Sequence, residues 1–598
     1  MKSVIESNKK YIFWDFLRIP LSICPICSLL KVFNVVLAAL IPSFQVLLTA
    51  DFVDTAMAIF AGTKAQTDIF SPLFLLMATV GYSGLNPQLI SFVDLRFEMK
   101  LTQVYRSAMA EKRARLAYRH IENADSWDLI TRTCTDPVTK LKEGFDSCLD
   151  AASIVIRVFS LLLILLAQVW WAGAVIVTAS IPLFWLSLKG GKATYQASVE
   201  AQKFSRRAAY LQKVLSDREN VEERSLFGYT DAVNQMWYEK YETSRKINLK
   251  VRLKYFIRMK GSSLITVALS MFIMAVLLFP LSHGQITIGM FMGLITTTLD
   301  LVHVMSWSLS NAMESLAKNR EYLKDLTAFC ALEEAPGSLD MPCDISALPL
   351  ESIEFRDVSF CYPGTDRFIL RHFNLRLENG LHYAIVGING AGKTTITKLL
   401  TGLYDNYDGE ILINGRSIRE YSQAQLKAMF AVVYQDFARY FVSMRDNIAL
   451  GNVLSADEEK IRKSASNAGL DEAISQKTAG LDSILGKIKQ NGVDLSGGQW
   501  QKVAIARALY NPANVRILDE PTAALDPIAE SNVYEMFGRV SAGKTTIFIT
   551  HRLGAARLAD RIVVIQEGKV AEEGSHEQLL ARKGIYAEMF DAQRSWYQ

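Results

Sequence analysis

The chain divides into two halves by its pattern of hydrophobic and polar positions. In the first half, long apolar stretches alternate with long polar ones. A helix needs about 20 apolar residues to cross the core of a bilayer. Any single stretch could be a buried helix of a soluble protein, but six in one half-chain favour membrane spans. The six stretches cover 29–50, 69–93, 150–170, 172–188, 261–280 and 287–311.

The second half has short apolar runs separated by turn residues, as in an ordinary soluble α/β domain. An acidic, proline-rich stretch over 331–350 separates the halves. At 598 residues the chain is long enough for more than one domain. We therefore expect a multi-domain membrane protein: a six-helix all-α transmembrane domain over 1–330, a linker over 331–350, and an α/β domain over 351–598.

Basic residues predict how the spans are oriented. The connections between the second and third spans and between the fourth and fifth are rich in Lys and Arg, whereas 51–68 holds only Lys64 and 281–285 holds none. Positive charge stays on the cytoplasmic side of a membrane. We expect both termini, both long connections and the α/β domain in the cytoplasm.

Composition narrows the functional classes. The formal net charge is only +4, which argues against a nucleic-acid partner. The seven cysteines are scattered, and the close pair Cys24 and Cys27 has no second pair or histidines nearby. We interpret that pair as packing near the membrane rather than a metal or redox site.

A glycine-rich loop is the most informative motif. It follows an apolar run over 382–386, which predicts a strand, and precedes 396–400, which predicts a helix. This context is typical of a phosphate-binding loop, in which backbone amides at a helix N-terminus face a polyphosphate. We expect Lys393 to reach the β- and γ-phosphates of ATP and the Thr394 hydroxyl to hold Mg²⁺. The loop consists of Gly387, Ile388, Asn389, Gly390, Ala391, Gly392, Lys393, Thr394 and Thr395.

Two further elements lie downstream of this loop, a strand that ends in two carboxylates and a second glycine-rich element before it. The run over 515–518 predicts a strand that ends in the carboxylates Asp519 and Glu520. Asp519 is placed to hold Mg²⁺, usually through water, and Glu520 to polarise the attacking water as a general base. Shortly before that strand, a second glycine-rich element precedes a helix-like stretch. Its residues are Leu495, Ser496, Gly497, Gly498 and Gln499.

With these motifs in this order, the chain resembles an ATP-binding cassette (ABC) transporter over its whole length, as a half-transporter with the exporter-type membrane fold. The resemblance implies an α/β P-loop ATPase domain and four further roles. Tyr362 would stack on adenine, and Gln435 would contact Mg²⁺. Asp526 would cross a dimer interface, and His551 would touch the γ-phosphate. Gln490 departs from the family, which often carries Glu there, and this puts the charge of a membrane-coupling contact in doubt.

The resemblance also implies long cytoplasmic helical extensions that end in short coupling helices. We expect these near Asn123–Asp128 and Glu223–Tyr229. Trp127 and Phe227 would either anchor in grooves of the ATPase domain or pack within the helical bundle.

In this family each ATP lies between the phosphate loop of one ATPase domain and the LSGGQ segment of another, so the chain should act as a dimer in a bacterial plasma membrane. A homodimer is favoured; a heterodimer with another half-transporter, an importer, and a gated channel or sensor are alternatives. The exported cargo would be a peptide, a lipid or a drug. The segment Gln435–Ile448 resembles that of some bacterial exporters of modified peptides, including lanthipeptides.

Two ionisable residues in the sixth span are candidates for the cargo path. Asp300 and His303 lie three positions apart, on one helical face. Ionisable groups at membrane depth are costly unless they face water or a partner. They would line a cavity, form a structural pair with each other, or lie in the cytoplasmic extension.

Overall fold

A computed structural model describes residues 5–168, 203–217, 220–304, 308–344, 348–486, 492–520 and 543–594, with isolated positions between 178 and 201 and between 535 and 538. The chain forms two compact units. The first comprises Met1–Arg113 and Asp128–Leu332, and the second comprises Ala114–Trp127 and Glu333–Gln598. The short segment Ala114–Trp127 therefore belongs with the C-terminal half, although it lies early in the sequence.

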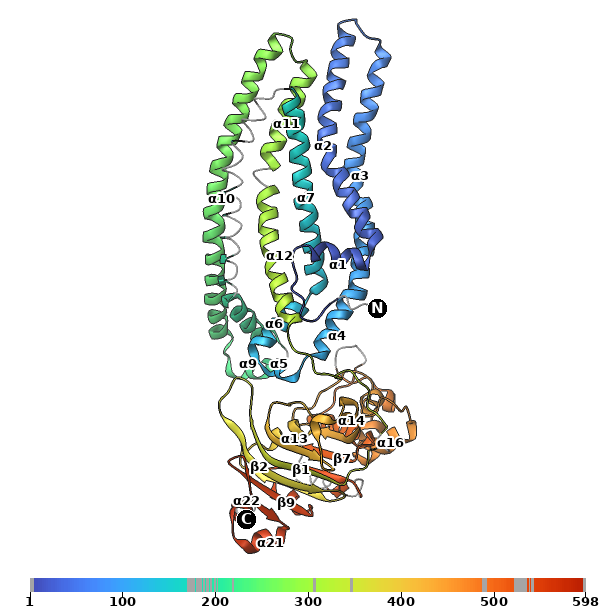
Figure 1. Cartoon of the computed structure of the whole chain (residues 1–598), viewed down its shortest axis with the longest axis vertical. Coiled ribbons are helices and arrows are strands. Elements are labelled where there is room, and N and C mark those ends of the chain that lie inside the picture. The colour runs from blue at the N-terminus through green and yellow to red at the C-terminus, as the bar shows by residue number, and fades with distance from the viewer. Residues whose placement is uncertain are drawn as a thin grey trace. The chain divides into compact units, whose positions relative to one another are not determined.

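The first unit is helical. Helix α2 packs along α3, α7 and α11, while α12 packs against α7 and α10 against α11 (Figure 1). The helices of this unit and of segment Ala114–Trp127 are α1 (Asp15–Ile23), α2 (Pro25–Phe60), α3 (Phe70–Leu101), α4 (Ser107–Arg115), α5 (Tyr118–Glu122), α6 (Ala124–Cys134), α7 (Pro137–Gln168), α9 (Val221–Phe227), α10 (Thr230–Ser282), α11 (Ile288–His303) and α12 (Leu309–Cys330).

Three helices of the described residues are long and apolar enough to cross a membrane: Pro25–Phe60, Gln66–Arg115 and Pro137–Ala167. They contain the first two predicted spans and most of the third. Helix α10 includes the span expected at 261–280 but runs on from Thr230, and the apolar helix Ile288–Leu301 covers part of the last span. The span expected at 172–188 lies largely outside the described residues.

Small residues bring α11 close to α2. A Cβ atom added to Gly289 would lie 2.0 Å from the carbonyl oxygen of Ala50, so only glycine allows this approach. The carboxylate of Asp54 on α2 accepts hydrogen bonds from the Gly289 amide at 2.8 Å and the Thr287 hydroxyl at 2.5 Å. These bonds satisfy donors at the start of α11 that the helix itself leaves unpaired.

Charged side chains inside the membrane helices have partners. Lys31 of α2 is buried and pairs with Asp94 of α3 at 2.7 Å and Asp146 of α7 at 2.5 Å. Asp300 of α11 pairs with Arg157 of α7 at 3.1 Å. Asp300 therefore has a partner other than His303, whose side chain lies outside the described set. Pairing lowers the cost of holding charges at membrane depth.

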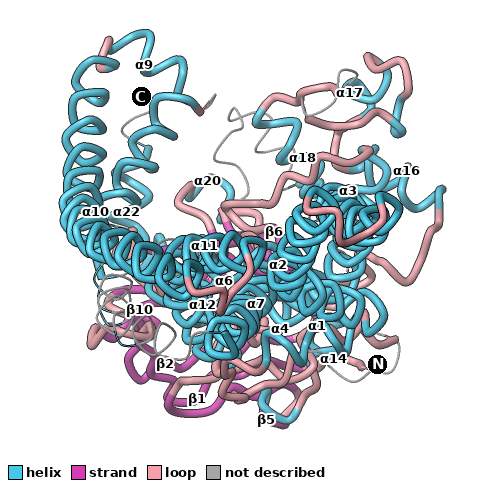
Figure 2. Tube along the Cα trace, turned by 90° about the horizontal axis from the view of Figure 1, so that it is seen from above, coloured by secondary structure: helices cyan, strands magenta, loops and turns pink. Residues whose placement is uncertain are grey.

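The strands belong to the second unit (Figure 2). One sheet has four strands in the order β2-β1-β4-β5, and the other has six in the order β10-β9-β3-β8-β7-β6. In the six-stranded sheet, β9, β3, β8, β7 and β6 run parallel, whereas β10 pairs antiparallel with β9. The strands are β1 (Ser352–Cys361), β2 (Phe368–Glu378), β3 (His382–Gly387), β4 (Asp408–Ile413), β5 (Arg416–Ser417), β6 (Phe430–Val433), β7 (Val515–Asp519), β8 (Thr545–Ile549), β9 (Arg561–Gln566) and β10 (Lys569–Gly574).

The parallel strands are buried on both faces, and every residue of β7 and β8 is buried, including the polar side chains of Arg516, Asp519, Thr545 and Thr546. Successive side chains point to opposite faces, so Ile517 joins one hydrophobic core and Leu518 the other. The core around Leu518 includes Trp500 and Val503 of α18. The helices of this unit are α13 (Lys393–Leu400), α14 (Gln423–Met429), α15 (Met444–Ala449), α16 (Glu458–Asn467), α17 (Asp471–Ser475), α18 (Gly497–Tyr510), α20 (Leu553–Ala556), α21 (His576–Arg582) and α22 (Ile585–Arg594).

The Arg157–Asp300 pair generates a stability prediction. Replacing either residue with its neutral amide, Arg157→Gln or Asp300→Asn, leaves the other charge without its partner. Each single variant should destabilise the protein by roughly 1–2 kcal/mol, because the pair is only partly buried. The double variant should recover part of that loss. Thermal unfolding in detergent measures all three, and losses that simply add would contradict a direct pair.

Candidate functional site

The predicted site residues gather at the carboxyl ends of neighbouring parallel strands. Gly387 ends β3, Asp519 ends β7, and Gln435 and His551 follow β6 and β8 closely. Since these strands are adjacent in the order β3-β8-β7-β6, residues far apart in sequence meet at one edge of the sheet. In open α/β sheets this edge is where ligands bind.

The glycine-rich loop joins β3 to α13 as expected. Gly392, at the start of α13, has φ 102°, a left-handed conformation that a residue with a side chain rarely adopts. The Lys393 ammonium donates to the carbonyls of Gly387 at 3.0 Å and Ile388 at 3.2 Å. Burial lowers the pKa of Lys393. The loop thus curls around a cation at the N-terminus of a helix, an arrangement suited to phosphate groups.

Asp519 and Thr394 form a set of hard oxygen ligands. The Thr394 hydroxyl donates to Oδ1 of Asp519 at 3.2 Å, while Oδ2 of this fully buried residue has no hydrogen-bond partner in the described structure. Burial raises the pKa of Asp519 to about 6. A buried carboxylate oxygen without a donor is costly unless a cation or its water shell satisfies it. These residues therefore fit Mg²⁺.

Glu520, His551 and Lys393 form a short chain of polar contacts. Nε2 of His551 contacts the Glu520 carboxylate, and Nδ1 lies 3.4 Å from the Lys393 ammonium. Burial and the nearby Lys393 charge lower the pKa of His551, so the imidazole is neutral at physiological pH. Its partners place the proton on Nε2, where it is donated to Glu520. Glu520 also has φ 47°, an uncommon conformation that is concentrated at functional sites.

Tyr362 is positioned by neighbouring aromatic rings and by α13. Its hydroxyl lies 3.0 Å from that of Thr395, and its ring meets the rings of Phe360 and Tyr404 edge to face. The Lys398 ammonium lies 5.2 Å from the Tyr362 ring centroid. These contacts hold an aromatic side chain beside the phosphate loop.

One cavity of about 460 Å³ brings many of these residues together. It is large enough for a nucleotide, and its lining includes an aromatic ring as well as Glu520 and His551. Its described lining includes no residue of the LSGGQ segment. The lining residues are Tyr362, Ile369, Asn389, Gly390, Gly392, Lys393, Thr394, Thr395, Gln435, Glu520 and His551.

The LSGGQ segment forms an exposed helix start. Ser496 caps α18 by accepting from the Gln499 amide at 3.2 Å, and the Gln499 side chain accepts from the Ser496 amide at 3.0 Å. Ser496 and Gly497 are exposed. The remaining predicted site residue, Asp526, and the departure at Gln490 both lie outside the described residues.

The loop that follows Gln435 is fixed by Arg507 of α18. The Arg507 guanidinium donates to the carbonyl of Asn447 at 3.0 Å and to its side chain at 3.1 Å, and it lies over the Tyr440 ring. A half-buried arginine thus ties the helix after LSGGQ to the loop after Gln435. No sequence motif indicates this contact.

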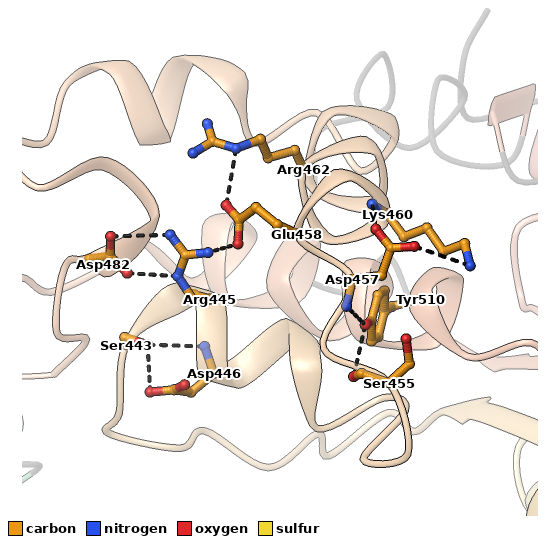
Figure 3. Close-up of polar contacts among 10 residues, drawn as sticks. All are labelled: Ser443, Arg445, Asp446, Ser455, Asp457, Glu458, Lys460, Arg462, Asp482 and Tyr510. Carbon is orange, nitrogen blue, oxygen red and sulfur yellow. Dashed lines mark hydrogen bonds and ion pairs between the residues drawn. The ribbon is translucent and has the colours of Figure 1, made fainter.

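A network of ion pairs fixes the helices beyond that loop (Figure 3). Arg445 of α15 binds Asp482 at 2.7 Å and also pairs with Glu458 of α16, which accepts from Arg462 at 3.0 Å. Exposed pairs are weak singly, but a shared arginine costs less entropy per contact. The network links three segments of the α-helical part of this unit.

A second group of residues, which no sequence motif indicates, contacts α13 and the loop after it. The carboxylate of Glu122, in α5, accepts from the Lys398 ammonium and the Tyr404 hydroxyl. Tyr118, also in α5, meets the Tyr404 ring edge to face at 5.5 Å. Helix α6 begins at Ala124, within the range where a coupling helix is expected, and these contacts come from the helix before it, α5.

Comparisons with known proteins now place the chain. The ABC transporter family profile matches residues 370–523. The ATP-dependent lipid A-core flippase of Pseudomonas aeruginosa is 30% identical, over 87% of this chain and 85% of that protein. The chain belongs to the ABC transporter family. It is an exporter-type half-transporter, a multi-pass membrane ATPase coupled to transport.

Other relatives match over nearly the whole exporter. The subtilin transport ATP-binding protein of Bacillus subtilis is 29% identical, over 93% of this chain and 90% of that protein. The nisin transport ATP-binding protein of Lactococcus lactis subsp. lactis is 27% identical, over 99% and 98%. A bacterial Atm1-family ABC exporter solved with ATP bound shares the fold, with a TM-score of 0.79 over 94% of this chain and 98% of that one, at 24% identity.

The raised pKa of Asp519 predicts a pH-dependent stability of this exporter. A carboxyl whose pKa rises from 3.8 to about 6 on folding stabilises the fold at low pH, and this contribution is lost as the pH rises through about 6. Asp519→Asn should therefore stabilise the protein at pH 7.5 by up to about 3 kcal/mol, with little effect near pH 4. Thermal unfolding without nucleotide at both pH values measures this, with the exposed Asp591→Asn as control. An equal effect at both pH values would contradict the assignment.

Proposed function

We propose that the chain works as a homodimer that exports a peptide, driven by ATP hydrolysis with Mg²⁺. The observation that carries the ATPase part is the cavity in which Lys393, Thr394, Glu520 and His551 converge beside an aromatic ring. In this proposal Tyr362 stacks on the adenine. The amides from Gly390 to Thr395 and the Lys393 ammonium bind the phosphates.

Hydrolysis transfers the γ-phosphoryl group of ATP to water: the bond from the γ-phosphorus to the β,γ-bridging oxygen breaks, a bond to the water oxygen forms, and ADP leaves. Glu520 orients the attacking water and accepts its proton, which ends in the released phosphate or solvent. His551 would donate its single N–H to Glu520, as in this structure, or to the γ-phosphate once ATP is bound. Mg²⁺ would be held by Thr394, Asp519 and Gln435, and it would neutralise part of the phosphate charge.

We infer a dimer because the described lining of the nucleotide cavity includes no residue of the LSGGQ segment. Ser496 and Gly497 instead stand exposed at the N-terminus of the 14-residue helix α18. An exposed helix N-terminus offers amides and a positive dipole end to an anion. We infer that α18 of a second copy completes the site at the γ-phosphate, with Asp526 at the same interface.

Exposed apolar side chains support the proposal that a helix of one copy's membrane domain packs on the ATPase domain of the other copy. Helix α9 exposes Leu226 and Phe227 to 78% and 69%, and the loop after Gln435 exposes Tyr440, Phe441 and Val442. Exposed apolar clusters of this kind mark interaction sites. In the proposed dimer, α9 of one copy packs on that loop of the other. ATP-driven closure would then rock the membrane helices between inward and outward openings, with the ATPase domain in the cytoplasm.

A peptide cargo is supported by two relatives that match 93% and 99% of this chain, which are named for transport of subtilin and nisin. A lipid is the second candidate, supported by the flippase at 30% identity. Asp300 and His303 remain candidates for the path of either cargo. ATPase activity of the protein in lipid, titrated with cationic amphipathic peptides or with lipid A, separates the two: stimulation by lipid A alone would overturn the peptide proposal.

Glu520→Gln tests the hydrolytic role. The amide cannot accept the water's proton, so ATP turnover should fall by at least about a hundredfold. ATP binding should stay near that of the parent protein, because the phosphate contacts remain. Phosphate release and equilibrium ATP binding are measured on the full-length protein, with the exposed Glu459→Gln as control. Turnover close to the parent's rate would exclude Glu520 as the general base.

Ser496→Arg tests the composite site. The bulky cation occupies the exposed helix start, so the variant should lose ATPase activity while each chain still binds ATP. The purified chain alone should hydrolyse ATP before this change. Activity that appears only after a different half-transporter is added would favour a heterodimer instead.

A further inference from the structure

One carboxylate of segment Ala114–Trp127 binds two side chains of the ATPase domain. Glu122 accepts from the Lys398 ammonium and from the Tyr404 hydroxyl. Burial alone would raise the pKa of Glu122, but these hydrogen bonds outweigh it and lower the pKa, so the residue is ionised at neutral pH. Backbone bonds from Ala117 to Glu333 at 3.0 Å and from Ala335 to Arg115 at 2.8 Å fix the first part of the same segment.

Both partners of Glu122 contact Tyr362, the ring at the base end of the nucleotide cavity. The Tyr404 and Tyr362 ring centroids lie 5.7 Å apart at an interplanar angle of 79°, and the Lys398 ammonium lies 5.2 Å from the Tyr362 centroid. Lys398 is also 5.5 Å from the Tyr118 ring of the segment. Tyr404 itself is 3% exposed, so its ring cannot shift without moving its neighbours.

We propose that Glu122 is a positioning residue for base recognition: it fixes Lys398 and Tyr404, and through them the orientation of Tyr362. The inference rests on the proposed function, in which Tyr362 stacks on adenine. It adds that the segment between α4 and α6 responds to the base end of the nucleotide. Since α4 precedes and α6 continues out of this segment, base binding and the helices of the membrane domain become linked, and the linkage is reciprocal.

A competing view is that Glu122 only anchors α13, which also carries Lys393 and Thr394. The two views differ in which ligand they affect. Reorienting Tyr362 weakens a ligand that has a base, whereas shifting α13 weakens any polyphosphate. ATP and inorganic tripolyphosphate therefore discriminate between them.

The test measures the dissociation constants of ATP and tripolyphosphate, each with Mg²⁺, on the full-length protein in lipid, in the Glu520→Gln background that prevents turnover. Glu122→Ala should weaken ATP binding by about three- to tenfold, the range expected for losing an oriented aromatic contact. Tripolyphosphate binding should not change. The matched control is Asp125→Ala in the same segment, because Asp125 makes none of these contacts.

A second variant distinguishes loss of this contact from misfolding of the Glu122→Ala protein. Tyr404→Phe keeps the ring and removes only the hydroxyl that Glu122 accepts, so it should weaken ATP binding in the same direction. Combined with Glu122→Ala it should add nothing, because both changes remove one connection. Equal weakening of ATP and tripolyphosphate by Glu122→Ala, unchanged ATP binding, or fully additive losses would each overturn the proposal.

Tyr362→Ala separates this inference from the proposed function. If Tyr362→Ala weakens ATP but not tripolyphosphate while Glu122→Ala changes neither, base stacking stands and the positioning role fails. If Tyr362→Ala leaves ATP binding unchanged, the stacking role itself fails.

Discussion

A buried carboxylate that the protein does not fully satisfy lies at the centre of the ATPase domain. Asp519 is completely inaccessible, yet only one of its oxygens has a hydrogen-bond donor among the described residues. Leaving such a group unpaired costs on the order of 1–3 kcal/mol. The strand that ends at Asp519 is flanked by parallel neighbours, and their ends carry the groups that, in the proposed function, complete a site for a metal-bound polyphosphate.

At this edge of the sheet, a carboxylate, an imidazole and an ammonium group lie close together. Burial lowers the pKa of His551, which is neutral at physiological pH, and also that of Lys393, while the contact between His551 and Glu520 keeps the carboxylate oriented. A neutral imidazole can donate to Glu520 at one nitrogen and accept from Lys393 at the other. The three residues therefore support one another without placing an unpaired charge in the cavity.

The sequence was sufficient for the parts of the site that local chemistry determines. The glycine loop and the acid pair depend on short motifs, since a tight turn needs glycine and a metal needs oxygen ligands. The spans at 29–50 and 69–93 were predicted because bilayer thickness sets a length. By contrast, helix α10 has no break at residue 261, where the fifth span is expected to begin. A helical extension before the span keeps the same helical period, so the start of the span cannot be located from that period.

Contacts between distant side chains were not predictable. Glu122 meets Lys398 across 276 positions and Tyr404 across 282, and nothing in the composition around Glu122 distinguishes it from other surface acids. Likewise, Asp300 pairs with Arg157 on another helix, a contact that no motif around either residue indicates. Such pairs depend on how elements pack, which a single sequence does not encode in a short motif.

The central claim is that each ATP site is built from two copies of this chain. Complementation tests it most directly: Lys393→Ala and Ser496→Arg chains, each inactive alone, are co-expressed with different tags and the mixed dimer is purified. One site of that dimer combines an intact phosphate loop from one chain with an intact LSGGQ segment from the other. The account predicts that the mixed dimer regains ATPase activity that neither parent dimer shows. A mixed dimer that forms but hydrolyses no more ATP than its parents would contradict it.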